Sequence, residues 1–472
     1  MVVLTATNNQ ALVPGLKQRR IKLAQLFEPP VILWSGNFIG RNFPANKMPF
    51  RASSHFLYFA GIPLNNTVIR LDRGELELFT DNPPPEATLW HGAAPDRDDI
   101  GATIGADRVY PLAELTNKTT GAATIAIQDL ATYQQQCQLL NRNLSLSHEA
   151  DSIDLKLALA LVKLRSHHDD LALQELRQAA KISVQAHKAG MRATKNASTE
   201  AEIRGTMEGV IIAQNMTCAY NSIVTVRGEV LHNESYHNLL SPEDLLLADV
   251  GAETANGWAA DITRTWAVSG KFSSTQKDIY ELVLKAHDDC ITKLRPGVEY
   301  HDIHLLAAHI IAEGLVDLGI LRGNAEDLVA MDTHALFFPH GVGHLLGLDV
   351  HDMEDLGDVA GYEPGRSRSD RFGLGYLRLN RPLQARMLVT IEPGFYQVPA
   401  ILNDPNFRAK YRDVVNWERL AKFADVRGIR IEDDVLITDS GAEVITAELP
   451  TKVEEIENLV LQQNQVVESE NN

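Results

Sequence analysis

Two aspartates flank a hairpin signal in the middle of the chain. An apolar run ends at Asp249, an Asn-Gly turn signal follows, and a second strand-like run carries Asp261. If the loop is centred on Ala255, the two aspartates face each other across the strands, whereas a two-residue turn would place Asp249 opposite Arg264. Because like charges opposite each other destabilise a hairpin, the first register favours cations between the carboxylates. The alternative for this motif alone is a solvated acidic hairpin.

Three histidines lie close together further along the chain. The segment FFPHGVGHLLGLDVHD contains His340, His344 and His351. The glycines between the first two argue against a regular helix and favour a backbone shaped around a site. Core filling would require a buried hydrogen-bond partner for each imidazole. The segment therefore indicates a binding or catalytic site.

Two further carboxylates belong to strand-like segments near the end of the chain. Glu392 ends the apolar run in MLVTIEPGFY, and Glu432 follows Arg430 by two residues in GIRIEDDV. Strand alternation places Arg430 and Glu432 on one face. A carboxylate that points inward is costly unless it is paired or bound to a metal. Arg430 could be that partner, which would make the pair purely structural.

Taken together, these motifs predict a two-metal hydrolytic centre. Four carboxylates and one histidine carry four formal negative charges, which two divalent cations would neutralise. Oxygen-rich ligation with one imidazole suits Mn²⁺ better than it suits a typical zinc site. Two cations about 3.5–4 Å apart, bridged by a carboxylate and a hydroxide, generate a nucleophile and stabilise a tetrahedral intermediate. The candidate carboxylates are Asp249, Asp261, Glu392 and Glu432, and the candidate histidines are His340, His344 and His351.

The elements that must position these residues fall into two domains. The first part of the chain mixes short β-rich runs with helical stretches, which predicts an α/β domain. Residues 71–74 are typical of a hairpin loop. The expected strands are 31–34, 67–71, 75–79 and 123–127, and the expected helices are 16–26 and 129–136.

A second domain begins between residues 160 and 170. Ser166 and Asp169 resemble a capping box that opens a long amphipathic helix, and Ser273 to Gln276 forms another. The remaining pattern alternates helices with short apolar strands. We expect strands at 245–249, 388–392 and 428–436, a last helix at 452–462, and a frayed polar tail at 463–472.

Composition excludes several classes of function. The 472 residues include 44 basic and 62 acidic side chains, and the resulting net charge of −18 disfavours nucleic acid as a partner. The three cysteines Cys137, Cys218 and Cys290 can form neither a disulfide framework nor a zinc knuckle, which fits a reducing cytoplasm. We expect no signal peptide and no membrane span, because the necessary apolar runs are missing.

The ordered motifs resemble one known family. DVGAETANGWAADITRT, HGVGH, IEPG and RIEDD, together with RASSHFLYFAGI in the first domain, resemble the pita-bread metallopeptidases, in the branch of aminopeptidase P and prolidase. The resemblance implies an α/β N-terminal domain at 1–165 and an α+β pita-bread catalytic domain at 166–462. Asp249 and Asp261 are twelve residues apart, one more than is usual in the family, which predicts a bulge or a longer loop.

The resemblance also assigns the metal ligands. Asp261 and Glu432 would bridge two metal ions, which are expected to be Mn²⁺. Asp249 would complete one metal site. His344 and Glu392 would complete the other.

The same resemblance implies roles for residues around the metals. Glu392 would also act as general base on the bridging water, and His351 would assist the tetrahedral intermediate or the leaving group. His232 and His340 would line the substrate pocket. Arg430 would hold the carboxylate network, as a partner that orients the ligands.

The implied activity is that of an Xaa-Pro aminopeptidase, which releases the N-terminal residue from peptides with proline at the second position. A homodimer or homotetramer built through the N-terminal domains is implied as well. The alternative is an Xaa-Pro dipeptidase, because the long insertions resemble prolidase and Arg378 lies where prolidases bind the substrate carboxylate. Arg378 could also be a solvated loop charge. A pseudo-peptidase that only binds partners would lack the metal ligands, and all five are present.

Overall fold

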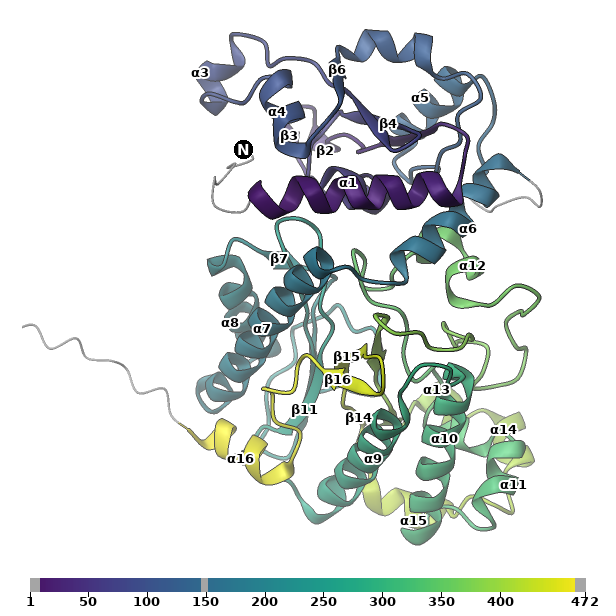
Figure 1. Cartoon of the computed structure of the whole chain (residues 1–472). Helices are drawn as coiled ribbons and strands as arrows, with labels where there is room; N and C mark the ends of the chain where they lie inside the picture. Colours follow the sequence, from purple (N-terminus) through teal and green to yellow (C-terminus); the bar gives the residue numbers. More distant parts are fainter. Residues whose placement is uncertain (1–8, 146–151, 463–472) are drawn as a thin grey trace, which may run out of the picture. The chain divides into compact units, whose positions relative to one another are not determined.

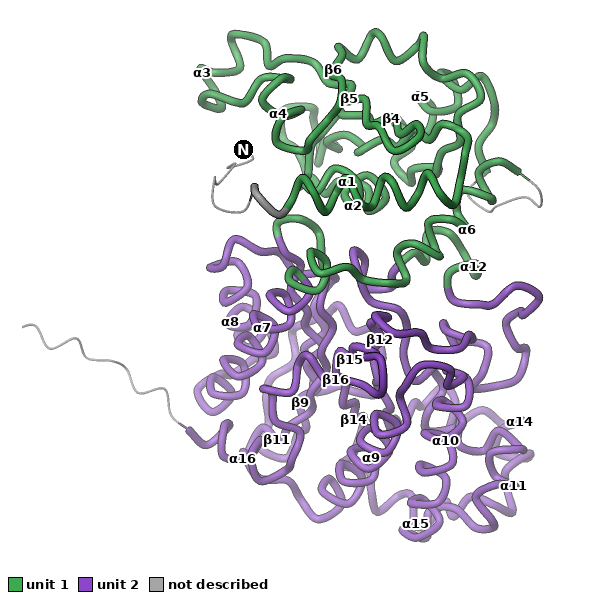
Figure 2. Tube along the Cα trace, in the orientation of Figure 1, with its two compact units in different colours: residues 1–175, 255–258, 353–360 green, residues 176–254, 259–352, 361–472 purple. Residues whose placement is uncertain are grey.

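The computed structural model describes residues 9–145 and 152–462, and it divides into two compact units (Figure 2). Unit 1 comprises the chain up to Glu175 together with 255–258 and 353–360, and unit 2 contains the remainder. The division falls inside helix α7 (Asp170–Ala193), just beyond the expected boundary at 165. The predicted tail at 463–472 lies outside the described residues. None of the helices in the described ranges has the length and apolarity that crossing a bilayer requires.

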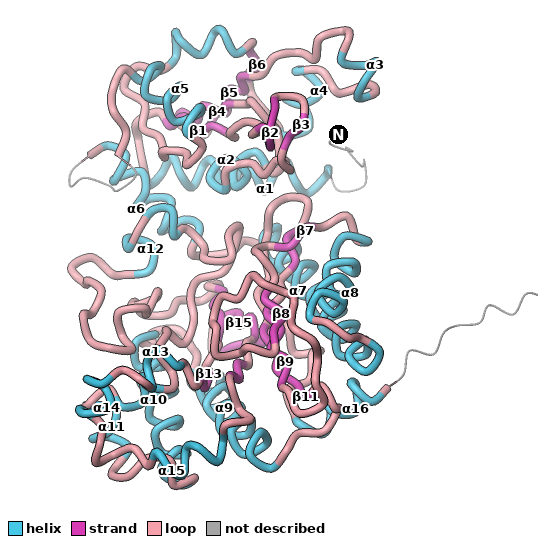
Figure 3. Tube along the Cα trace, turned by 180° about the vertical axis from the view of Figure 1, so that it is seen from behind, coloured by secondary structure: helices cyan, strands magenta, loops and turns pink. Residues whose placement is uncertain are grey.

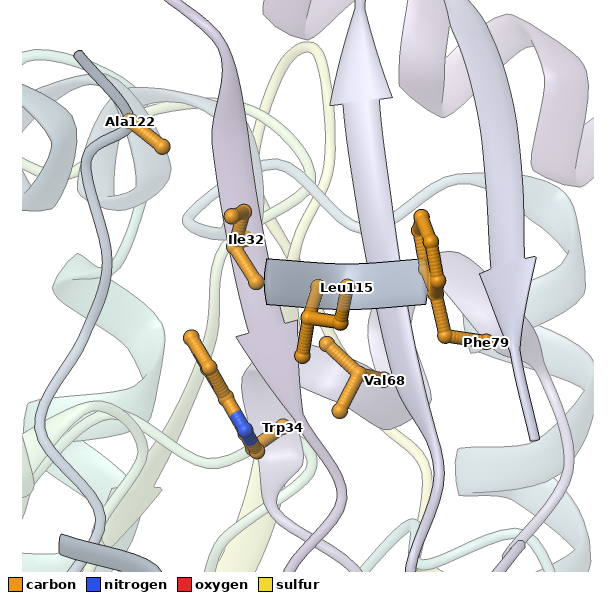
Figure 4. Packing of buried hydrophobic residues seen from close by; sticks show 6 residues of the cluster. All are labelled: Ile32, Trp34, Val68, Phe79, Leu115 and Ala122. Carbon is orange, nitrogen blue, oxygen red and sulfur yellow. The ribbon is translucent and has the colours of Figure 1, made fainter. Parts of the chain in front are cut away.

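Unit 1 is built on a four-stranded sheet with the strand order β1-β4-β5-β6. The strands β4 (Val68–Asp72) and β5 (Glu75–Phe79) form the predicted hairpin, β1 (Val31–Trp34) pairs antiparallel with β4, and β6 (Arg108–Tyr110) pairs parallel with β5. Figure 4 shows part of its core, Ile32, Trp34, Val68, Phe79, Leu115 and Ala122. The other elements are α1 (Asn9–Leu26), β2 (Gly40–Phe43), β3 (Asn46–Lys47), α2 (Ser54–Ala60), α3 (Ala87–His91), α4 (Arg97–Ile104), η1 (Leu112–Lys118), α5 (Leu130–Leu140) and α6 (Ile153–Arg165).

The strand expected at 123–127 does not form. Ala123 makes only an isolated bridge to Val31. The Gln136 amide instead accepts a hydrogen bond from the Ile127 N–H at 2.9 Å and donates one to the Ile125 carbonyl at 2.9 Å. These bonds satisfy backbone groups that would otherwise have paired with a sheet, so the segment stays irregular.

The start of the second long helix also differs from the prediction. Ser166 is the C-cap residue of α6, and its hydroxyl donates to the Val162 carbonyl at 2.6 Å. Asp169 caps α7, since its side chain accepts from the Ala172 N–H at 2.9 Å. An aspartate directly before a helix is as good an N-cap as the serine three residues earlier, so sequence could not choose between them.

Unit 2 carries its strands in small antiparallel sheets between helices. Figures 1 and 3 show these strands between α7 and α8 (Glu200–Ala213) on one side and α10 (Tyr300–Asp317) on the other. The predicted capping box at Ser273 is confirmed and opens α9 (Ser274–Lys293). The sheets are β8 (Ile223–Thr225), β9 (Leu245–Asp249) and β11 (Thr263–Ala267); β12 (Leu388–Ile391), β15 (Asp433–Ile437) and β16 (Ala442–Val444); β13 (Gly394–Tyr396) with β14 (Gly428–Arg430); and β7 (Thr217–Cys218) with β10 (Ala252–Glu253).

The segment 428–436 is two strands rather than the single strand that was expected. It breaks after Arg430, because β14 pairs with β13 while β15 pairs with β12 and β16. Glu432 lies at the break.

The remaining elements are η2 (Thr194–Asn196), α11 (Ala325–Ala330), η3 (Thr333–Leu336), η4 (Glu354–Leu356), α12 (Asp358–Gly361), α13 (Pro399–Leu402), α14 (Pro405–Lys410), α15 (Trp417–Leu420), η5 (Ala421–Phe423) and α16 (Val453–Leu461).

Candidate metal centre

The two hairpin aspartates lie diagonally across β9 and β11. Asp249 pairs with Thr263, so neither of the two registers considered from sequence is correct. The same register continues to the bridge between Glu253 and Ala259, without a bulge in the paired strands. Asp261 lies two residues before Thr263, and the period of two therefore places both aspartates on one face. A direct pairing would have brought the carboxylates opposite each other, whereas the diagonal leaves more room between them.

The candidate ligand His344 is held by the strand that leads to Glu392. The His344 N–H donates to the Thr390 hydroxyl at 3.2 Å, and the Thr390 N–H donates to the His344 carbonyl at 3.0 Å. The Nδ1 atom of His344 contacts the Leu345 carbonyl at 3.0 Å. This contact fixes the tautomer and leaves Nε2 as the ligand atom, at 3.4 Å from Asp261 Oδ2 and 3.7 Å from Glu392 Oε1.

Glu432 is held at the break between β14 and β15. Its N–H donates to the Thr263 carbonyl at 3.0 Å, and the Thr263 hydroxyl donates to Glu432 Oε2 at 2.7 Å. Ligand atoms of Asp261, His344 and Glu432 all lie within 4.8 Å of one another. A group of this size and composition can hold a divalent cation.

One cavity collects all of the site residues expected from sequence. It has a volume of about 270 Å³ and is bounded mainly by charged and aromatic side chains. The structure thus brings together ten residues that span 200 positions of the chain. They are His232, Asp249, Asp261, His340, His344, His351, Arg378, Glu392, Arg430 and Glu432.

The carboxylates are strongly perturbed by one another. Burial and the nearby Asp249 charge raise the pKa of Asp261 to about 7. Burial likewise raises the pKa of Glu392 to about 7, against the opposing effect of His344. Burial and the Asp261 charge raise the pKa of Glu432 well above its usual range. So many buried acids are costly without cations, and the set therefore fits bound divalent metal.

An unpartnered oxygen supports the same fit. Asp249 Oδ2 accepts from Arg430, but the buried Oδ1 atom of Asp249 has no hydrogen-bond partner. Buried polar atoms are rarely left without a partner. The second oxygen is therefore free to ligate a cation.

Arg430 makes three hydrogen bonds around the centre, and none goes to Glu432. Its guanidinium donates to Asp249 Oδ2 at 2.6 Å, to the Thr263 hydroxyl at 3.0 Å and to the Tyr396 hydroxyl at 2.9 Å. The structural pairing with Glu432 that sequence left open is thus replaced by a pairing with Asp249. Arg430 fixes a candidate ligand and two of its neighbours at once.

Three functional side chains were missed by sequence reasoning. The Tyr220 hydroxyl donates to Asp261 Oδ1 at 2.6 Å. Tyr396 joins Arg430 to His340, whose Nε2 lies 2.8 Å from the Tyr396 hydroxyl. The Thr263 hydroxyl hydrogen-bonds to Glu432 and Arg430. Because side chains alternate along a strand, the position of Thr263 two residues after Asp261 could have predicted that it points to the same side. No local signal in the sequence distinguishes Tyr220.

The remaining histidines occupy different positions around the ligands. The His351 ring packs edge-on against His344, with 4.4 Å between centroids. Burial and the Arg430 charge lower the pKa of His340 to about 3, and they also lower the pKa of His232. The lowered pKa favours the neutral form of each imidazole.

Such a site, with buried carboxylates around a single imidazole and a polar cavity beside them, defines a metal-dependent hydrolase. The model of metallopeptidase family M24 matches residues 174–439, and that of the aminopeptidase P N-terminal domain matches residues 16–126. The chain belongs to metallopeptidase family M24. It is a metal-dependent peptidase, and the predicted α/β N-terminal domain and pita-bread catalytic domain are confirmed.

Relatives that are named for two different activities are about equally similar to this chain. A Sordaria macrospora protein named Probable Xaa-Pro aminopeptidase is 32% identical over 88% of this chain and 87% of its own length. The Homo sapiens Xaa-Pro dipeptidase is 31% identical over 97% and 93%, respectively. Aminopeptidase P of Escherichia coli, solved with the inhibitor Pro-Leu, has a TM-score of 0.78 at 27% identity and covers 95% of this chain and 98% of its own. The Pseudomonas aeruginosa aminopeptidase PepP has a TM-score of 0.78 at 28% identity and the same coverage.

Proposed function

We propose that this chain is an Xaa-Pro aminopeptidase that releases the N-terminal residue from peptides with proline at the second position. The observation that carries the proposal is the single cavity lined by all five candidate ligands together with three further histidines and two arginines. The names of the relatives support the substrate class, because both are peptidases of Xaa-Pro bonds.

Five side chains would hold two divalent cations. They would be Asp249, Asp261, His344, Glu392 and Glu432, of which Asp261, His344 and Glu432 offer ligand atoms within 4.8 Å of one another. Mn²⁺ is the expected metal, since four carboxylates and one imidazole form a hard donor set. The cations would supply an activated water as nucleophile and stabilise the charge that develops on the scissile carbonyl oxygen.

The protein's own groups would handle protons and orient the substrate. Glu392, a buried carboxylate held beside His344, would take a proton from the attacking water and return it to the leaving nitrogen. His351 would hydrogen-bond the tetrahedral intermediate. Arg430 and Tyr396 would hold Asp249 and His340 in place, while His340 and His232 line the substrate pocket.

One experiment tests this assignment directly. The Mn²⁺-loaded protein is incubated with Gly-Pro and, separately, with a Gly-Pro-Xaa tripeptide, and the products are identified by mass spectrometry. An aminopeptidase releases glycine from the tripeptide at least as fast as from the dipeptide. Failure to cleave either peptide would refute the proposal.

A dipeptidase is the second candidate, and Arg378 favours it. This arginine lines the same cavity as His232 and His340, and its positive charge contributes to the lowered pKa of both. A guanidinium at that place could bind the free carboxylate of an Xaa-Pro dipeptide. Strict preference for Gly-Pro over the tripeptide would support this candidate.

The surface of unit 1 supports self-association. Five large apolar side chains there are more than half exposed, and four of them are candidates for an interface, because exposed apolar patches mark interaction sites. We propose that these four belong to the contact of a homodimer or homotetramer, which light scattering coupled to size-exclusion chromatography would measure. A cytoplasmic location is also proposed, on the strength of three free cysteines. The four apolar side chains are Ile39, Phe43, Leu89 and Trp90.

A further inference from the structure

A buried glutamate outside the metal centre clamps the loop that carries His232. Glu200 is the first residue of α8 and is fully buried. The loop in question, residues 226–238, leaves the end of β8 and delivers Leu231 and His232 to the cavity. We refer to these thirteen residues as the His232 loop.

The Glu200 carboxylate binds both ends of this loop. At the start, Oε1 accepts from the Val226 N–H at 2.7 Å and from the Thr225 hydroxyl at 3.0 Å. At the end, Oε2 accepts from the Asn238 N–H at 3.3 Å, and the Asn238 amide nitrogen lies 3.0 and 3.1 Å from the two oxygens. Two loop ends that are twelve residues apart are thereby held by one side chain.

The clamp extends toward His232 through a hydroxyl. The Thr225 hydroxyl, which donates to Glu200, accepts from the Asn233 side chain at 2.7 Å and from the Arg227 N–H at 2.9 Å. Asn233 is the immediate neighbour of His232. The position of the imidazole is therefore connected to Glu200 by two consecutive hydrogen bonds.

The middle of the loop packs closely on the strand that carries Arg430. A Cβ at Gly228 would lie 2.7 Å from the Gly428 carbonyl oxygen, so only glycine permits this approach. Leu231 packs in the cluster that contains Tyr396. Contacts with β14 and with Glu200 therefore hold the backbone of the loop that carries His232.

The charge of Glu200 is explained by this arrangement. A buried carboxylate is costly unless donors surround it. Here several neutral donors converge on it, and it lies at the amino end of a helix, where the macrodipole favours a negative charge. An acceptor-only side chain is required, because each oxygen receives hydrogen bonds from the protein.

We propose that Glu200 is a positioning residue for substrate binding, acting through the His232 loop. This inference rests on the proposed function, because it assumes that His232 contacts the Xaa-Pro peptide. Glu200→Gln replaces one acceptor oxygen by an amide donor, so the side chain can keep its bonds to only one end of the loop, while the backbone bond from the Glu200 N–H to the Asn238 carbonyl remains. We expect KM for Gly-Pro peptides to rise about 10-fold while kcat changes less than about 3-fold and metal content is unchanged.

Two controls separate positioning from general stability. Glu202→Gln removes the same charge from the same helical turn, but Glu202 is exposed and contacts only the capping residues Ser198 and Thr199, so KM should not change. Asn238→Ala removes the amide that bonds to both Glu200 oxygens at the far end of the loop, and it leaves the two backbone bonds there in place. This variant should also raise KM, and it replaces Glu200→Gln in the test if Glu200→Gln does not fold.

A double-mutant cycle and an activity-independent measurement complete the test. If Glu200 acts through His232, Glu200→Gln should add little to the effect of His232→Ala. Hydrogen exchange of residues 226–238 should be faster in Glu200→Gln than in Glu202→Gln. Unchanged KM in folded variants, or full additivity with His232→Ala, would overturn the proposal. Wild-type protein that cleaves no Xaa-Pro peptide would refute the proposed function instead, while the exchange rates would still test the clamp.

Discussion

Arg430 Nη2 donates a hydrogen bond of 2.6 Å to Asp249 Oδ2, joining two strands that are 181 residues apart in the chain. The pair is buried, and the same guanidinium also reaches Thr263 and Tyr396. One oxygen of Asp249 is thereby occupied, and the other is buried without a hydrogen-bond partner. The arginine thus fixes the orientation of a candidate metal ligand.

Replacing this arginine should weaken metal binding and activity together. Arg430→Lys keeps the charge but cannot reach three partners at once, so we expect both metal affinity and kcat/KM to fall about 10–100-fold. Isothermal titration with Mn²⁺ and steady-state kinetics would measure both. Arg412→Lys, at an exposed site, is the matched control and should change neither. Equal metal affinity in Arg430→Lys and wild type would contradict the role of Arg430.

Loss of a shared carboxylate should abolish the activity. Asp261→Asn and Glu432→Gln each remove a charge expected to contact both cations, so activity should fall to background and bound metal should decrease. Asp413→Asn, in an exposed loop, should retain full activity. Chelator-treated wild type should be inactive and should recover on addition of Mn²⁺. Hydrolysis at an unchanged rate by metal-stripped protein would refute the metal assignment.

His351 should act on the reaction rather than on metal binding. Its ring packs against His344, while the Nε2 atom of His344 faces Asp261 and Glu392. His351→Ala is expected to lower kcat by roughly 10²–10⁴-fold with metal content unchanged, as measured by kinetics and elemental analysis. Loss of metal in this variant would make His351 a ligand. Near-normal kcat with lower stability would make it a packing residue.

Arg378 distinguishes the two candidate activities. For an aminopeptidase, Arg378→Ala should change kcat/KM for Gly-Pro and for Gly-Pro-Xaa by similar small factors. For a dipeptidase, the variant should lose activity on Gly-Pro alone, because only the dipeptide presents its carboxylate at that position. The ratio of the two kcat/KM values, compared with that of wild type, gives the answer.

Two buried histidines should make unit 2 sensitive to acid. Burial lowers the pKa of His304 to about 3 and that of His334 to about 4, and neither ring has a hydrogen-bond partner. The unfolded imidazoles bind protons below about pH 6.5, but the folded ones do not, so stability is complete above that pH and falls as the pH decreases toward the folded values. At pH 5, each histidine should cost about 2 kcal/mol.

The His304→Phe variant tests this expectation. Its ring would pack beside Phe338, whose centroid is 5.4 Å from that of His304. The loss of unfolding free energy between pH 7.5 and pH 5, measured by urea titration, should be smaller than in wild type by about 2 kcal/mol. His91→Gln, at an exposed histidine, should behave like wild type. An identical loss in His304→Phe would show that the buried ring does not govern acid stability.

The sequence by itself determined the candidate ligands, their order along the chain and most of the elements that carry them. Carboxylates at the ends of apolar strands are costly without cations, and this energetic penalty can be recognised locally. The hairpin at residues 71–74 and the capping box at Ser273 were equally local, because turn and cap chemistry depends on a few neighbouring residues.

The tertiary structure alone decided which strands and side chains meet. The alternation of side chains predicts which face of a strand a residue occupies, but not which residue it pairs with. The sequence therefore could not predict that Asp249 pairs with Thr263, or that Arg430 hydrogen-bonds to Asp249. The hydrogen bond from Tyr220 to Asp261 links residues 41 positions apart, and such distant contacts leave no periodic signal. The clamp of Glu200 on the His232 loop arises in the same way, because folding brings the start of a helix against both ends of a distant loop.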